Sequence, residues 1–150
     1  LLKTLTNERN IMKVLSKYPM IKLDNGLKVV NYSSPHPYTF DTGEVLPACE
    51  EDVSRKSMLK AEHDVTDVTI RDIDVQEVSI KYKMPKWMFM ELVKISIMID
   101  VDIILVPYPV MTALKDRRKS GFRDRLQAKA RVCKLTDRVT KVISSTQFCV

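Results

Sequence analysis

The sequence predicts a single α+β domain over residues 1–150, with a mainly antiparallel or mixed sheet and about three helices. Three observations predict this class: turn signals recur along the chain, several segments alternate apolar with polar residues, and others repeat apolar residues every three or four positions. The composition, 45% hydrophobic and 29% charged, is typical of a folded globular protein. A chain of this length buries roughly 70% of its unfolded surface, so we expect one self-sufficient core.

The clearest turn signals lie in the first third of the chain. Residues 21–30 alternate on both sides of Asn25-Gly26, and we expect this pair to supply the positive φ values of a tight hairpin turn. Asp41-Thr-Gly-Glu44, flanked by apolar residues, predicts a second hairpin. Before both, we expect an amphipathic helix capped by Asn7 and running to Tyr18.

The remaining elements follow from apolar spacing. Residues 65–83 alternate in two phases, which predicts two strands, each with a polar side, in a sheet with one face in water. Residues 86–98 follow Pro85 and predict a heavily buried helix, whereas the apolar run 101–106 predicts a central strand. We also expect a short helix within 50–62, a helix over 110–118 ending near Gly121, and strands at 131–135 and 142–150.

Charge is unevenly distributed along the chain. Residues 115–141 contain eleven Lys and Arg against three Asp, a net charge of +8, whereas residues 41–77 carry a net charge of −7. The two segments either neutralise each other, within the fold or between subunits, or the basic segment remains free to meet an anionic partner. A solvated surface of mixed ion pairs is the simplest interpretation.

The glycines exclude several enzyme classes. Gly26, Gly43 and Gly121 are the only three and are isolated, so neither a Walker loop nor a dinucleotide-binding motif can be assembled. No serine lies between two glycines, as a nucleophile elbow requires. Phe40-Asp-Thr-Gly43 resembles the catalytic turn of aspartic proteases over four residues, but we interpret it as a hairpin turn.

Metal and thiol chemistry have little support in the sequence. Glu62-His63-Asp64 places carboxylates beside an imidazole, but adjacent strand residues point to opposite faces and no zinc-like spacing accompanies them. A cysteine nucleophile paired with His36 or His63 is left as an alternative. We expect no metal site, no cofactor and no nameable catalytic residue.

The cysteines and the apolar segments predict the cellular compartment of the protein. Three widely spaced cysteines favour thiols in a reducing compartment, and the chain start lacks the features of a secretory signal, so we expect a cytoplasmic protein. The apolar run 95–114 contains Asp100, Asp102 and two prolines. Because each mid-span Asp costs about 2.5–3.5 kcal/mol, we expect no membrane association.

Two polar residues are candidates for a small-molecule or nucleotide-handling site. His36 lies between two prolines, whose rigid extended backbone presents its imidazole, and Tyr108 lies in the Pro107–Pro109 turn. An enzyme built around these residues is one alternative function. The competing interpretation of His36, which we favour, is a structural turn.

The basic segment supplies the candidate partner-binding residues. Guanidinium and ammonium groups cluster beside Phe122, which predicts phosphate contacts next to one stacking surface. The residues concerned are Arg117, Arg118, Lys119, Arg123 and Arg125. Nucleic acid is a possible partner, although no established nucleic-acid-binding motif accompanies the cluster.

Four motifs resemble a family of small, uncharacterised proteins of T4-like bacteriophages. They are Asn31-Tyr-Ser-Ser-Pro-His-Pro37, Asp41-Thr-Gly-Glu-Val-Leu-Pro47, Ile103-Ile-Leu-Val-Pro-Tyr-Pro-Val-Met111 and Phe148-Cys-Val150. The first is similar to an Asn-Leu-Thr-Pro-His opening of small phage and prophage proteins, although here it follows a thirty-residue extension. The resemblance implies an accessory protein in the cytoplasm of the infected bacterium, with no assigned activity.

The function expected from these observations is therefore a binding module without enzymatic activity. It would act on a host or phage macromolecule through the basic C-terminal surface, and a homo-oligomer is possible. The enzyme with His36 and the nucleic-acid-binding protein are the alternatives.

Overall fold

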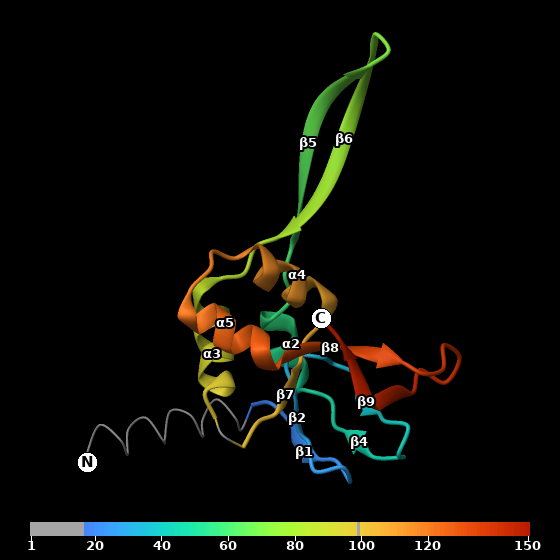
Figure 1. Cartoon of the computed structure of the whole chain (residues 1–150), viewed down its shortest axis with the longest axis vertical. Coiled ribbons are helices and arrows are strands. Elements are labelled where there is room, and N and C mark those ends of the chain that lie inside the picture. The colour runs from blue at the N-terminus through green and yellow to red at the C-terminus, as the bar shows by residue number, and fades with distance from the viewer. Residues whose placement is uncertain (1–16, 99) are drawn as a thin grey trace, which may run out of the picture.

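A computed structural model describes residues 17–98 and 100–150 and confirms the α+β class (Figure 1). The predicted helix over residues 7–18 lies almost entirely outside the described residues. The described helices are α2 (Glu51–Lys56), α3 (Lys86–Ser96), α4 (Tyr108–Asp116) and α5 (Gly121–Lys129). The strands are β1 (Met20–Lys22), β2 (Lys28–Asn31), β3 (Tyr38–Thr39), β4 (Val45–Leu46), β5 (Ala61–Ile70), β6 (Ile73–Tyr82), β7 (Ile103–Leu105), β8 (Ala130–Leu135) and β9 (Ile143–Cys149).

The main sheet is mixed and has the strand order β1-β2-β7-β8-β9. Strand β7 is parallel to both β2 and β8, whereas the outer pairs β1–β2 and β8–β9 are antiparallel. The sheet curls until Ile143 of β9 forms a bridge with Phe40, next to β3, and the Asp41 amide donates to the Ile143 carbonyl at 2.8 Å. The small hairpin β3–β4 therefore closes one side of the sheet.

Both faces of the sheet centre are covered. On one face, Val30 and Ile104 pack beneath the helices; on the other, Val29 and Leu105 pack with Phe40 of the β3–β4 hairpin. Successive strand residues point to opposite faces, so a strand covered on both sides needs apolar residues at every position. This explains the continuous apolar run 103–106, and β7 within it confirms the predicted central strand.

The two predicted hairpins share one loop geometry, which corrects the expected tight turn. In each, three residues connect the closing positions: the Leu23 amide donates to Leu27 and the Phe40 amide to Glu44. Gly26 has a φ of 92° and Gly43 a φ of 88°, and each follows a residue with negative φ. The loops are thus type I turns ending in a left-handed glycine, and Asn25 does not supply a second positive φ.

The helical part of the chain differs from the prediction at one point. Gly121 does not end a helix: it begins α5, where the Ser120 hydroxyl accepts a hydrogen bond from the Arg123 amide. Of the α5 residues only Arg123 and Leu126 are buried, so the apolar repeat that reveals a helix is nearly absent. The other predicted helices are present, with α2 shorter than expected and α4 starting at Tyr108.

The largest difference concerns residues 61–82. They form two antiparallel strands as predicted, but β5 and β6 pair only with each other and extend from the body as an arm (Figure 1). Nearly every residue of the arm is exposed on both faces. The expectation of a sheet with one wet and one buried face is therefore wrong for this segment, because the described part of the chain contacts the arm only near its base, where Tyr82 packs against the core.

Candidate interaction surfaces

The arm, residues 61–82, is a regular two-stranded ribbon. Ten residues of β5 pair with ten of β6, from Ala61 opposite Tyr82 to Ile70 opposite Ile73. At about 3.3 Å per residue, the ribbon is roughly 33 Å long. Arg71 and Asp72 form its two-residue turn with φ values of 52° and 63°, the left-handed pair that a type I′ turn requires.

The pairing places apolar side chains on both faces of the arm. Near the body, Val65 opposite Val78 and His63 opposite Ile80 share one face. Towards the tip, Val68 opposite Val75 and Ile70 opposite Ile73 share the other face, because successive residues alternate. Ile73 remains 64% exposed and Val78 61% exposed. A chain that folds alone rarely leaves so many large aliphatic side chains in water on one element.

The arm is also acidic. It carries six acidic residues against Arg71 and Lys81, a net charge of −4. Within the described part of the chain, Asp64 is the one arm carboxylate that has a cation within 4.0 Å, its partner being Lys81 at 3.1 Å. Most of the arm's negative charge is therefore left facing solvent.

The basic segment divides into anchored and exposed cations. Arg123 is only 8% exposed: its Nε donates to the Leu114 carbonyl at 3.2 Å and its Nη2 to the Lys115 carbonyl at 2.9 Å. These carbonyls end α4, so the guanidinium satisfies the C-terminus of that helix. Arg123 is thus structural, and we remove it from the candidate binding residues.

Arg117 is anchored as well. Its Cζ lies 3.9 Å from the centroid of the Phe89 ring, and its Nη1 donates to the Met84 carbonyl at 3.4 Å. The contact ties the chain between α4 and α5 to the beginning of α3. Farther along, Lys129 and Arg131 donate to backbone carbonyls of Met98, Gln127 and Ala130.

Some exposed cations lie on the helical side of the body, whereas Lys134, Arg138 and Lys141 lie in β8 and the β8–β9 loop. Arg118 and Lys119 lie between α4 and α5, Arg125 lies on α5, and Lys86 lies at the start of the neighbouring α3. Met90 and Phe122 are exposed on the same two helices, whereas Trp87 of α3 lines a hollow with Glu50, Asp52 and Glu91 and is not part of this surface. We call the four cations, Met90 and Phe122 the basic face. Among the described residues, none of its four cations has a carboxylate within 4.0 Å.

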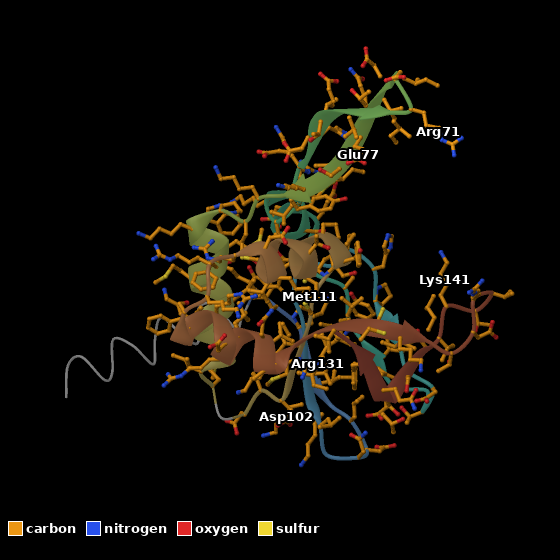
Figure 2. All side chains as sticks on the ribbon, turned by 45° about the horizontal axis from the view of Figure 1, so that its top comes forward. Arg71, Glu77, Asp102, Met111, Arg131 and Lys141 are labelled. Atoms are coloured by element: carbon orange, nitrogen blue, oxygen red, sulfur yellow. The ribbon has the colours of Figure 1, made fainter. Side chains whose placement is uncertain are left out.

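The acidic and basic segments do not neutralise each other through ion pairs in the described structure. Residues 17–98 and 100–150 form five ion pairs, and none of them joins a carboxylate of residues 41–77 to a cation of residues 115–141. Figure 2 shows Arg71 and Glu77 on the arm, separate from Arg131 at the beginning of β8 and from Lys141 in the β8–β9 loop. The charge separation along the sequence is therefore also a separation in space.

The His36 and Tyr108 candidates lie on neighbouring segments without sharing a site. Both side chains are exposed, and Tyr108 is 69% accessible at the start of α4. A cavity of about 270 Å³ lies where the two segments meet, but neither side chain lines it. Its lining consists of Ser33, Pro35, Ser54, Ser57, Met58, Leu59, Pro107, Pro109 and Val110. No acid, base or second candidate faces these serines in the cavity.

The motif that contains His36 has a structural role. Asn31 is fully buried: its Nδ2 donates to the Pro47 carbonyl at 2.9 Å, and its Oδ1 accepts from the Ser34 amide at 3.1 Å. The Ser34 hydroxyl in turn bonds the backbone of His36. These contacts hold the Asn31–Pro37 corner against β4, which explains the residues of the motif without a ligand.

Thiol and metal chemistry gain no support. Burial raises the pKa of the Cys49 thiol and of the Cys133 thiol, and Cys49 Sγ donates to the Asn31 carbonyl at 3.3 Å. A raised pKa leaves less thiolate, the reactive form. Over residues 17–98 and 100–150, no group of three or more His, Cys, Asp or Glu side chains is arranged to hold a metal ion.

Comparison with known proteins adds no relative. No protein-family model, curated protein or solved structure matches the chain. Within the described residues, no helix combines the length and apolar character needed to cross a membrane. The arm and the basic face are therefore the features on which a functional argument rests.

Proposed function

We propose that this protein is a binding module and that the arm is its protein-docking element. The observation that carries the proposal is the exposure of the arm: a ribbon of ten residues a side with Val and Ile in water on both faces. An isolated two-stranded hairpin is at best marginally stable in water and usually needs a further element against it. A partner protein is the natural source of that element.

Two features of the arm favour a protein partner over other ligands. Its outer edges present unpaired backbone groups that a strand or side chains of another protein can satisfy. Its net charge of −4 repels nucleic acid and anionic lipid. A fixed base also favours docking: Tyr82 packs against the core and Met84 is buried, so the ribbon is held where it leaves the body.

The biological setting of the proposal comes from the sequence motifs. Their resemblance to small proteins of T4-like phages supports an accessory role in the cytoplasm of an infected bacterium, where the partner is a host or phage protein. Two of these motifs have a structural role in the body. The first forms the corner around the buried Asn31, and the third begins with strand β7 (Ile103–Leu105).

The nucleic-acid alternative has one observation in its favour, the exposed Arg118, Lys119 and Arg125 beside Phe122. Fluorescence anisotropy with a labelled single-stranded DNA oligonucleotide tests it. Binding that weakens steeply with salt and is abolished by Arg118→Glu would support this function instead. Under our proposal, the protein does not bind the oligonucleotide at physiological salt.

Photo-crosslinking tests the docking proposal directly. A photoreactive amino acid in place of Ile73, at the tip of the arm, is expected to form an adduct with another polypeptide during expression in the bacterial host. The matched control is the same substitution at Val139, which is 90% exposed but lies in the β8–β9 loop. Adducts at neither position, or equal adducts at both, would overturn the arm as a docking element.

A further inference from the structure

We infer that the partner of the arm is a second copy of this chain: the acidic arm of each copy packs on the basic face of the other. This inference rests on the proposed function and specifies the protein that docks. It gives a symmetric dimer in which one kind of contact occurs twice.

Charge complementarity is the first argument. The arm carries a net charge of −4, and residues 118–125, which supply most of the basic face, carry four Lys and Arg against one Asp, three of the cations being exposed. Opposite charges that are separated within one chain attract when two chains meet, and they orient the encounter. Because the arm leads away from the body, a chain does not satisfy its own basic face (Figure 1).

The same charges exclude the two other symmetric arrangements. Two arms packed side by side would bring two net charges of −4 together, and two basic faces would repel in the same way. When an arm packs on a basic face, each charged surface contacts a surface of opposite charge. Reciprocal exchange leaves no arm uncovered, so the assembly closes at two copies.

The basic face also offers apolar groups of the kind that the arm needs. Met90 and Phe122 are exposed on the same two helices as its cations, and they match the exposed Val and Ile side chains of the arm. Aromatic residues, Met and Arg are enriched where protein interfaces bury surface. A ribbon about 33 Å long and two strands wide presents roughly 300 Å² per face, so two such contacts bury roughly 1,200 Å² in total, the lower end for a specific interface.

A charge-swap experiment with the full chain tests the inference. The arm variant carries Asp67→Lys, Asp74→Lys and Glu77→Lys, and the face variant carries Arg118→Glu, Lys119→Glu and Arg125→Glu; all six side chains are exposed. Sedimentation equilibrium should give twice the 17.3 kDa chain mass for the wild type and a monomer for each variant alone. The equimolar mixture of the two variants should again dimerise.

The mixture is decisive because each contact in it joins opposite charges. If the arms packed on each other, the face variant alone would still dimerise, and that result would overturn the inference. The matched control is Asp24→Lys with Arg138→Glu, two exposed positions outside both surfaces, which should dimerise like the wild type. Circular dichroism establishes that each variant is folded.

A second measurement needs no variant. The dissociation constant of the wild-type dimer should rise at least about tenfold between low and high salt, since exposed charges are screened beyond roughly 10 Å at 0.1 M salt. A wild type that is monomeric at all salt concentrations overturns this inference. If Ile73 then crosslinks to a different protein, the docking function stands; if it crosslinks to nothing, both fail.

Discussion

The arm and the sheet of the body are built from the same residue types and have opposite surroundings. Val29 and Val30 in β2 are completely buried, one on each face, whereas Val65 and Val78 in the arm are more than half exposed. The strands of the body lie between helices and the β3–β4 hairpin, whereas each arm strand pairs only with the other among the described residues, and the arm touches the core only at its base. The comparison teaches that alternating apolar and polar residues specify a strand, but they do not specify whether another element covers its apolar face.

The two regions should differ most in how much the free energy of unfolding falls when an isoleucine is replaced by alanine. Ile104→Ala opens a cavity in the fully buried sheet centre and should lower the free energy of unfolding by about 2–5 kcal/mol. Ile73→Ala at the arm tip should change it by less than about 0.5 kcal/mol in the monomer. Urea unfolding at low protein concentration measures both, and similar losses would contradict the described difference.

The second comparison contrasts two arginines of α5. Arg123→Ala removes two charge-assisted hydrogen bonds to carbonyls at the C-terminus of α4, so it should cost about 1.5–3 kcal/mol of unfolding free energy. Arg125→Ala removes an exposed cation and should cost less than about 0.5 kcal/mol. Equal thermal denaturation curves for the two variants would show that Arg123 has no capping role.

A smaller effect is expected at the arm turn, where Arg71 adopts a left-handed conformation that disfavours most side chains. Arg71→Asn should stabilise the ribbon by up to about 1 kcal/mol, because Asn tolerates positive φ better. Arg71→Ala removes the same charge without this tolerance and serves as the control. Hydrogen exchange of the arm amides should slow in the first variant only.

The smallest effect concerns pH and lies in the β8–β9 loop of the body. Hydrogen bonds from the Val139 amide and from Thr140 hold the pKa of Asp137 below its usual value. The ionised carboxylate therefore stabilises the loop above its ordinary pKa near 3.9, and this stabilisation is lost as the pH falls through the lowered pKa. NMR titration of the Val139 amide should show this transition, and Asp137→Asn should abolish it.

Much of the body was accessible to prediction because its signals are local. Gly26 and Gly43 mark turns by their own conformational freedom, and the apolar run in β7 reflects burial on two faces. Helix α5 was missed because only two of its residues are buried, so its formation rests on the Ser120 cap and on contact with α3. A serine three residues before Arg123 was the one local signal available.

The candidate surfaces were accessible only in part. The excess of Lys and Arg at 115–141 is visible in the sequence, but Arg123 and Arg118, five residues apart, differ in role because one reaches the end of α4 and the other faces solvent. The arm residues looked like half-buried strands, and the apolar groups of the basic face come partly from α3, about thirty residues earlier. Long-range contacts, which sequence spacing does not encode, make these distinctions.

The sequence by itself determined the α+β class, the hairpins, the strands and the opposite charges of two segments, since these depend on the conformational preferences and polarity of neighbouring residues. Only the tertiary structure decided that β5 and β6 stand away from the core and that the two charged segments do not pair within the chain. The physical reason is that burial and ion pairing depend on which surfaces meet, and surfaces are formed by residues far apart in the chain.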